Sequence, residues 1–162
     1  MRNLVLWVLV VFSLSLAQHH HGGHGGHGGA APQGRLTSVQ LRLVEGWVRL
    51  VPSSLRDTTV YFTLQNPLAR DLRLVGGSSS VAQMVMLMED YRESRSGQTV
   101  LGMREVKSLL LPRAGKLVLQ PGGKHLMLMG LKRPLREGER IPIRLFFEGN
   151  QETLIELRVE RR

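Results

Sequence analysis

The chain contains the stretch Lys116-Leu117-Val118-Leu119-Gln120-Pro121-Gly122-Gly123-Lys124-His125-Leu126-Met127-Leu128-Met129-Gly130, in which two short runs flank a Pro-Gly-Gly sequence. In the second run, Leu126 and Leu128 alternate with His125, Met127 and Met129. Because successive side chains of a β-strand point to opposite faces, each run predicts a strand. Adjacent proline and glycine are typical of a turn. The stretch therefore predicts two consecutive strands, with His125 near one end of the second.

The same alternation recurs on both sides of this stretch. It is found at Val39–Leu43, Thr59–Leu64, Ile141–Phe146 and Leu154–Val159. Turn residues separate the runs at intervals of roughly 10 to 15 residues, and no long stretch has a helical period. Pro142 is expected on an edge or at a strand start, because proline cannot donate a hydrogen bond to a neighbouring strand. The pattern predicts an all-β domain, an antiparallel β-sandwich or barrel.

The N-terminal part of the chain has a different character. Leu4–Leu16 is almost continuously apolar but shorter than the roughly 20 residues that span a bilayer, and Ser15-Leu16-Ala17 offers a cleavage site for signal peptidase. We predict a secretory signal at 1–17, a disordered His/Gly-rich tail at 18–35 and one β domain at 36–162. The mature protein is thus expected in the periplasm or another extracytoplasmic space, without stable membrane insertion.

The predicted tail holds five of the six histidines of the chain, on a string of glycines: His19, His20, His21, His24 and His27. Imidazole nitrogens suit Cu(II), Zn or Ni(II). If cleavage follows Ala17, the free amine of Gln18 and the third-position His20 can wrap a square-planar Cu(II), unless Gln18 cyclises. The tail is therefore a candidate secondary Cu(II) site, with a merely solubilising role as the alternative.

Composition narrows the classes of function. The chain has no cysteine, which excludes blue-copper sites, dinuclear copper sites and Cys-x-x-Cys metallochaperones, all of which need thiolate. The net charge of +9 first suggests nucleic-acid binding. However, the arginines are scattered and seldom accompanied by aromatic residues, and export argues against such a partner. We interpret the charge as a solvated surface and expect no nucleic-acid partner.

Six of the seven methionines lie between Met84 and Met129, together with His125, the only histidine of the β domain. Thioether sulfurs and an imidazole without thiolate are the ligands expected for Cu(I) outside the cytoplasm. Methionine is also an ordinary filler of hydrophobic cores, so packing is the alternative interpretation. In a strand, Met84, Met86 and Met88 share one face, and so do His125, Met127 and Met129.

The run from Pro121 to Leu135, which includes His125-Leu126-Met127-Leu128-Met129-Gly130-Leu131, resembles the signature of the periplasmic copper chaperones called PCuAC. Their pattern is His or Met, ten residues, Met, twenty-one residues and His-x-Met. Here Met103 and His125 have the family spacing, and Met127 completes His-x-Met. The resemblance covers about Glu45 to Val159. Its first ligand corresponds to Met88, with Met84 and Met86 as alternatives on the same face.

The resemblance implies a Cu(I) site of Met88, Met103, His125 and Met127, with Met84, Met86 and Met129 as possible alternates. The gap between Met88 and Met103 is longer than in the family, and Tyr91–Gln98 is predicted as a lengthened hairpin loop. The family further implies a cupredoxin-like Greek-key β-sandwich or barrel. It implies a carrier, not an enzyme, that delivers copper to the dinuclear CuA centre in subunit II of cytochrome c oxidase. The alternatives are a copper buffer that also uses the tail, a copper redox enzyme, and a structural domain.

Overall fold

The computed structural model describes residues 34–162, with the exception of the Arg95 side chain. This part of the chain folds entirely into strands and connecting turns, which confirms the all-β prediction. The strands are β1 (Thr37–Ser38), β2 (Arg42–Arg49), β3 (Thr58–Gln65), β4 (Leu72–Ser78), β5 (Ala82–Arg95), β6 (Gln98–Glu105), β7 (Leu109–Leu111), β8 (Lys116–Leu119), β9 (Lys124–Leu131), β10 (Arg140–Phe147) and β11 (Gln151–Glu160). The predicted signal and nearly all of the predicted tail lie outside the described residues.

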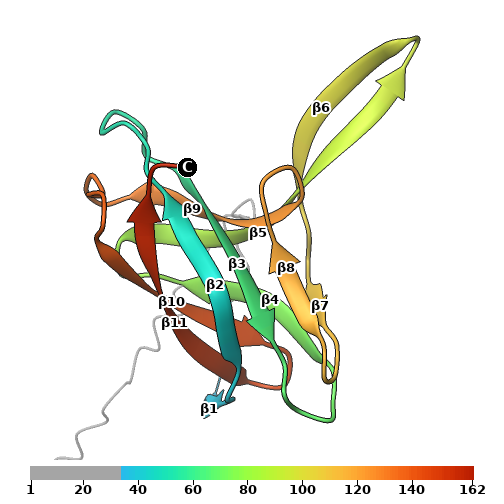
Figure 1. The fold of residues 1–162 in the computed structure, drawn as a ribbon, viewed down its shortest axis with the longest axis vertical. Coiled ribbons are helices and arrows are strands. Elements are labelled where there is room, and N and C mark those ends of the chain that lie inside the picture. The colour runs from blue at the N-terminus through green and yellow to red at the C-terminus, as the bar shows by residue number, and fades with distance from the viewer. Residues whose placement is uncertain (1–33) are drawn as a thin grey trace, which may run out of the picture.

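Seven strands close into a barrel in the order β5-β9-β3-β2-β11-β10-β4, and β4 returns to β5 through the pair Gly77–Val85. The remaining strands extend this ring: β6 pairs with β5, β7 with β4, β8 with β3 and β1 with β11. Figure 1 shows the ring of strands and the hairpin of β5 and β6 projecting beyond it. The prediction of a barrel is thus correct. Its closure leaves β5 and β9 side by side over most of the length of β9.

The core follows from the alternation in the sequence. Every second side chain of β10 and β11 is buried, as Ile141, Ile143 and Leu157 are. In β5 and β9, too, the side chains that face the core are buried. Burying one such aliphatic side chain contributes roughly 1.5–3 kcal/mol. With no disulfide in the chain, this apolar interior holds the barrel together.

Two pairings, β1 with β11 and β2 with β11, depart from the predicted antiparallel pattern. β2 and β11 run parallel, through Trp47–Arg158, Val48–Val159 and Arg49–Glu160. These two strands lie at opposite ends of the sequence, and alternation alone carries no information on strand direction. Pro142 lies near the start of β10, outside the segment of β10 that pairs with β4. It therefore does not have to donate a backbone hydrogen bond to β4, which a proline cannot do.

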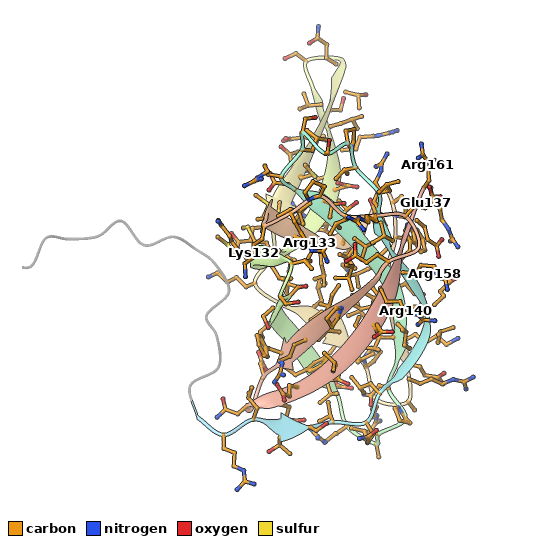
Figure 2. All side chains as sticks on the ribbon, turned by 90° about the vertical axis from the view of Figure 1, so that its left-hand side faces the viewer. Lys132, Arg133, Glu137, Arg140, Arg158 and Arg161 are labelled. Carbon is orange, nitrogen blue, oxygen red and sulfur yellow. The ribbon has the colours of Figure 1, made fainter. Side chains whose placement is uncertain are left out.

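The charged residues lie on the outside, as expected. Figure 2 labels six of them on the β10–β11 side and on the connection between β9 and β10. Several arginines are paired there, for example Arg140 with Glu156 at 3.1 Å and Arg144 with Glu152 at 2.9 Å. Exposed pairs of this kind contribute little to stability.

The prediction of a loop at Tyr91–Gln98 is wrong. β5 continues to Arg95 and β6 begins at Gln98, so only Ser96 and Gly97 form the turn. Both turn residues have positive φ, 49° and 80°, as tight hairpin turns of two residues require. The additional residues therefore lengthen a paired hairpin and do not disturb the register at its base.

Candidate metal centre

The register of β5 against β9 brings most of the predicted ligands together. Three directly opposed pairs follow one another along these strands: Met84–Met129, Met86–Met127 and Met88–His125. We call these three pairs the methionine ladder. Opposed side chains of an antiparallel pair lie on the same face, with Cβ atoms about 4.5–5.5 Å apart. The six residues therefore share one face of the sheet; alternation predicted a common face within each strand, and the register joins the two strands.

This shared face is not the one that builds the core. Val85 and Leu87 of β5 and Leu126 and Leu128 of β9, which occupy the alternate positions, are at most 3% exposed. By contrast, Met84 is 42% exposed. The other methionines of the ladder are half-buried, so none of them belongs to the fully buried core of the barrel.

Met103 joins the same face from β6. It pairs with Asp90, two residues beyond Met88 on β5. Met103 is therefore a diagonal neighbour of Met88, at a typical separation of 7–8 Å that long side chains bridge. Met127 is the diagonal neighbour of Met88 on β9. Of the three candidates for the first ligand, only Met88 neighbours Met103, His125 and Met127 at once.

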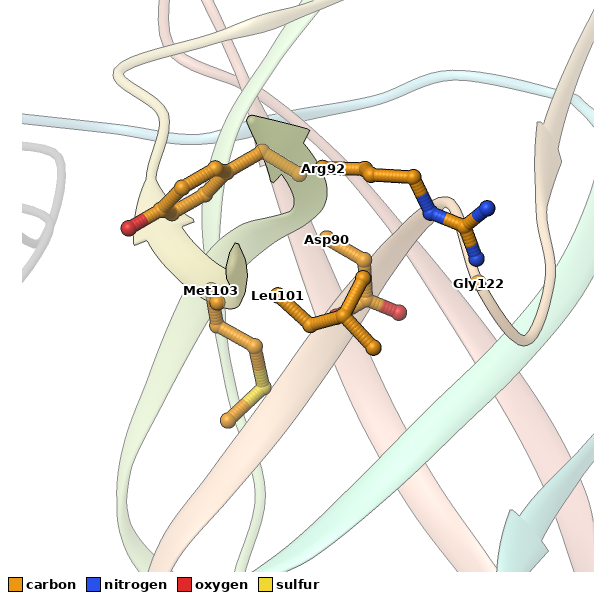
Figure 3. Close-up of a pocket in the computed structure, with 7 residues that line it drawn as sticks. Asp90, Arg92, Leu101, Met103 and Gly122 are labelled. Carbon is orange, nitrogen blue, oxygen red and sulfur yellow. The ribbon is translucent and has the colours of Figure 1, made fainter. Parts of the chain in front are cut away.

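A hollow lies beside Met103 at the base of the hairpin. Its volume is about 400 Å³, and it is lined by residues of β5, of β6 and of the turn before β9. Figure 3 shows Met103, Leu101 and Asp90 in this hollow. Met103 is 55% exposed. The predicted ligand set therefore has one member that is open to solvent.

His125, unlike Met103, is buried, with only 1% of its side chain exposed. Its Nδ1 lies 3.1 Å from the carbonyl oxygen of Gly123. A carbonyl oxygen only accepts, so this contact places the proton on Nδ1 and leaves the lone pair on Nε2. Within residues 34–162, the buried Nε2 has no hydrogen-bond partner. An imidazole held at Nδ1 by a carbonyl, with a free Nε2, is the arrangement found in metal-binding histidines. The residues therefore fit a metal.

The same carbonyl ties the hairpin to the turn before β9. Gly123 O also accepts a hydrogen bond from the backbone N–H of Asp90, at 3.0 Å. The Asp90 carboxylate lies 3.9 Å from His125 Nδ1. The strand that carries Met88 and the strand that carries His125 are thus fixed to one acceptor as well as to each other.

One aromatic residue outside the predicted site, Tyr61, lies beside His125, and a second, Trp47, packs on Tyr61. The Tyr61 ring lies 6.1 Å from the imidazole, and the Trp47 ring lies 5.3 Å from Tyr61. Arg162 covers the Trp47 ring at 4.5 Å. A signal for Tyr61 was available, since this aromatic residue interrupts the polar face of an alternating strand. Nothing in the sequence places Trp47 or Arg162 next to it.

The other predicted ligands lie elsewhere on this face or outside the described residues. Met84, Met86 and Met129 lie on the same face, on the side of the Met88–His125 pair away from Met103. The five tail histidines lie outside the described residues. Within the part of the chain that the structure describes, no three His, Asp or Glu side chains gather into a site for a hard cation.

The chemistry of this face is that of a soft cation site. Thioethers and one neutral imidazole select Cu(I) over hard cations such as Mg²⁺ and Ca²⁺. The Asp90 carboxylate, at 3.9 Å from His125 Nδ1, lies beyond ordinary hydrogen-bonding distance of the imidazole.

Sequence comparison finds relatives that are described as putative lipoproteins. Residues 41–159 match the family described as "Putative lipoprotein LpqE-like". The chain is also 33% identical over 108 residues to "Putative lipoprotein Lxx21020" of Leifsonia xyli subsp. xyli. That match covers 66% of this chain and 61% of the relative, so the chain spans less than two thirds of that protein.

Structural comparison finds the same barrel in copper-binding proteins. The Cu(I)-bound DR1885 protein of Deinococcus radiodurans is 36% identical, with a TM-score of 0.57 over 73% of this chain and 76% of that one. Its apo form is 33% identical, with a TM-score of 0.57 over 90% and 97%. The apo PCuAC domain of PmoF1 shares the fold alone, at 21% identity and a TM-score of 0.61 over 75% and 94%. The resemblance to PCuAC and the cupredoxin-like fold are thereby confirmed, and the chain belongs to the LpqE-like family.

Proposed function

We propose that the protein is a copper carrier that binds Cu(I) through Met88, Met103, His125 and Met127. The observation that carries the proposal is the buried Nε2 of His125, which has no hydrogen-bond partner in the described part of the chain and shares a face with thioethers. Leaving such a nitrogen unpaired is costly, roughly 1–3 kcal/mol. A bound Cu(I) would satisfy it. The copper-bound relative supports this choice of cation.

The unequal exposure of the ligands suits a carrier. His125 is fixed and buried, whereas Met103 lies at the exposed base of the hairpin. An acceptor protein can therefore displace Met103 first, while His125 still holds the ion. Thioethers exchange readily because they are neutral ligands, so their dissociation from the copper ion does not separate opposite charges. A carrier needs no acid–base chemistry, so we propose that the protein is not an enzyme.

The proposed acceptor is the dinuclear CuA centre of cytochrome c oxidase subunit II, in an extracytoplasmic compartment such as the periplasm. Export is supported by the lipoprotein names of the family and of the curated relative. The acceptor rests on the PCuAC resemblance. Transfer is tested by mixing the Cu(I)-loaded chain with the apo CuA domain and following the absorption of the assembled centre. If free Cu(I) assembles the centre as fast as the Cu(I)-loaded chain does, the carrier role is contradicted.

Binding itself is tested by anaerobic Cu(I) competition titration. All five tail histidines are first replaced by serine, so that only the barrel can bind. We expect tight binding that is lost in the His125→Ala variant. Tight binding that survives both changes unweakened would place copper elsewhere and contradict the site.

Copper buffering is a second candidate function, because the predicted tail carries five histidines. The tail variant separates the two functions in cells. If it loads the oxidase normally but lowers copper tolerance, the tail buffers and the barrel delivers.

A further inference from the structure

Three methionines of the ladder have no role in the four-ligand site: Met84, Met86 and Met129. They lie on the opposite side of the Met88–His125 pair from Met103. They do not belong to the barrel core, which the alternate residues Val85 and Leu128 fill from the other face: Met84 is exposed, and Met86 and Met129 are half-buried. Outward positions of an antiparallel pair usually carry polar side chains. Three adjacent thioethers there call for another explanation.

The register places these sulfurs within reach of one another. Met84 lies directly opposite Met129, and Met86 is the diagonal neighbour of Met129. Directly opposed Cβ atoms are about 4.5–5.5 Å apart, and diagonal neighbours about 7–8 Å. The methionine side chain is unbranched and has three rotatable bonds, so its sulfur can turn toward a point between neighbouring pairs. Three thioethers can thus meet at a single ion above this end of the ladder.

We propose that Met84, Met86 and Met129 form a second Cu(I) site, distinct from the site at His125. Its ligands are all thioethers, with no imidazole, and Met84 is 42% exposed. We therefore expect it to bind Cu(I) more weakly and to exchange it faster than the buried histidine site. Met127, opposite Met86, lies between the two sites and belongs to the first. This inference goes beyond the carrier proposal, because it concerns a separate set of ligands.

The experiment uses the full chain with the tail histidines replaced by serine in every variant. Two readouts are taken during anaerobic addition of Cu(I): the number of equivalents bound against a chromophoric competitor, and the NMR signals of ¹³C-labelled methionine methyl groups. The test variant combines Met84→Leu, Met86→Leu and Met129→Leu, which conserve volume and so preserve the fold. The converse variant is His125→Ala.

The proposal requires two equivalents in the parent chain. The first is expected to shift the methyl signals of Met88, Met103 and Met127, and the second those of Met84, Met86 and Met129. The triple variant should bind one equivalent, with the affinity of the first site changed by less than about twofold. The His125→Ala variant should retain the weaker equivalent.

Three results would overturn the proposal. A single equivalent in the parent, lost with His125, removes the second site and leaves the carrier function intact. A triple variant that weakens the tight equivalent by tenfold or more assigns these methionines to the first site. No Cu(I) binding in any variant removes both the second site and the proposed function.

Discussion

Met88 lies directly opposite His125 across β5 and β9. This pair is the centre of the proposed site, because Met103 and Met127 are the diagonal neighbours of Met88 on its two sides. Met86 also neighbours His125 diagonally, but it is two pairs away from the position of Met103. The register therefore ranks the three candidates for the first ligand, which the sequence left open.

The contribution of His125 and Met127 can be measured directly. We expect His125→Ala and Met127→Ala each to weaken Cu(I) binding by about tenfold or more, since changes even around a metal ligand cost 10- to 100-fold. Anaerobic competition titration gives the affinities, and circular dichroism checks that the barrel persists. Unchanged affinity in both variants would contradict the assignment.

Leucine substitutions along β5 test the ranking of the first ligand. Leucine has nearly the volume of methionine but no sulfur, so packing is largely retained. We expect Met88→Leu to weaken the tight Cu(I) equivalent most, by about tenfold, and Met86→Leu and Met84→Leu to change it by less than about twofold. If Met86→Leu has the largest effect, Met86 is the first ligand.

The turn before β9 is expected to control the histidine. Gly122 has a φ of +75°, so Gly122→Ala strains a turn that carries the acceptor for His125 Nδ1, at a cost of roughly 1–2 kcal/mol. Gly138→Ala is the matched control, because Gly138 has a φ of +80° and no ligand nearby.

Both variants should lose similar stability in chemical unfolding, but only Gly122→Ala should lower the Cu(I) affinity. Equal affinities would show that the carbonyl of Gly123 does not position the imidazole.

Gly46 tests the packing of the barrel. A Cβ atom at this position would lie 2.7 Å from Phe62 Cβ and 2.9 Å from the Tyr61 carbonyl oxygen. We expect Gly46→Ala to lower the free energy of unfolding by roughly 1–3 kcal/mol, the usual cost of overpacking. The exposed neighbour Val44 supplies the control, since Val44→Ala should change stability by less than about 0.5 kcal/mol. Urea unfolding of both variants decides the matter.

An ion pair on the connection between β9 and β10 gives a pH dependence. Arg133, labelled in Figure 2, hydrogen-bonds Glu139 and lowers the pKa of that carboxyl below its ordinary value. A lowered pKa contributes stability above the ordinary value of the carboxyl, and this contribution is lost as the pH falls through the folded-state value. The effect is small because the pair is exposed.

Melting temperatures of the parent and of Glu139→Gln between neutral and acidic pH measure this effect. The difference between them should be largest at neutral pH and should close in acid. A constant difference for Glu139→Gln would contradict the role of the ion pair.

Much of the fold could be predicted because alternation is a local property. The alternating runs at Ile141–Phe146 and Leu154–Val159 lie within β10 and β11. Strand direction and partner are not local, so the parallel pairing of β2 with β11 could not be read from the sequence. The hairpin strands could not be predicted, because the polar residues after Tyr91 are typical of a loop, whereas in the structure both strands there are solvent-exposed and alternate weakly.

The candidate site was predictable in its residues but not in its geometry. The spacing of Met103, His125 and Met127 selected them, and period two placed the last two on one face. The aromatic neighbour of His125, Tyr61, is remote in sequence and is brought close only through the pairing of β3 with β9. Which residues of the ladder lie opposite one another depends on the register of β5 against β9, and the periodicity of the sequence does not determine that register.

The ligand set is tested most directly by X-ray absorption at the copper K-edge. The sample is the full chain with its tail histidines replaced by serine, loaded anaerobically with less than one equivalent of Cu(I). We expect an edge typical of Cu(I), with three sulfur scatterers and one nitrogen, and loss of the nitrogen in His125→Ala. A first shell made only of nitrogen or oxygen would contradict the proposed site.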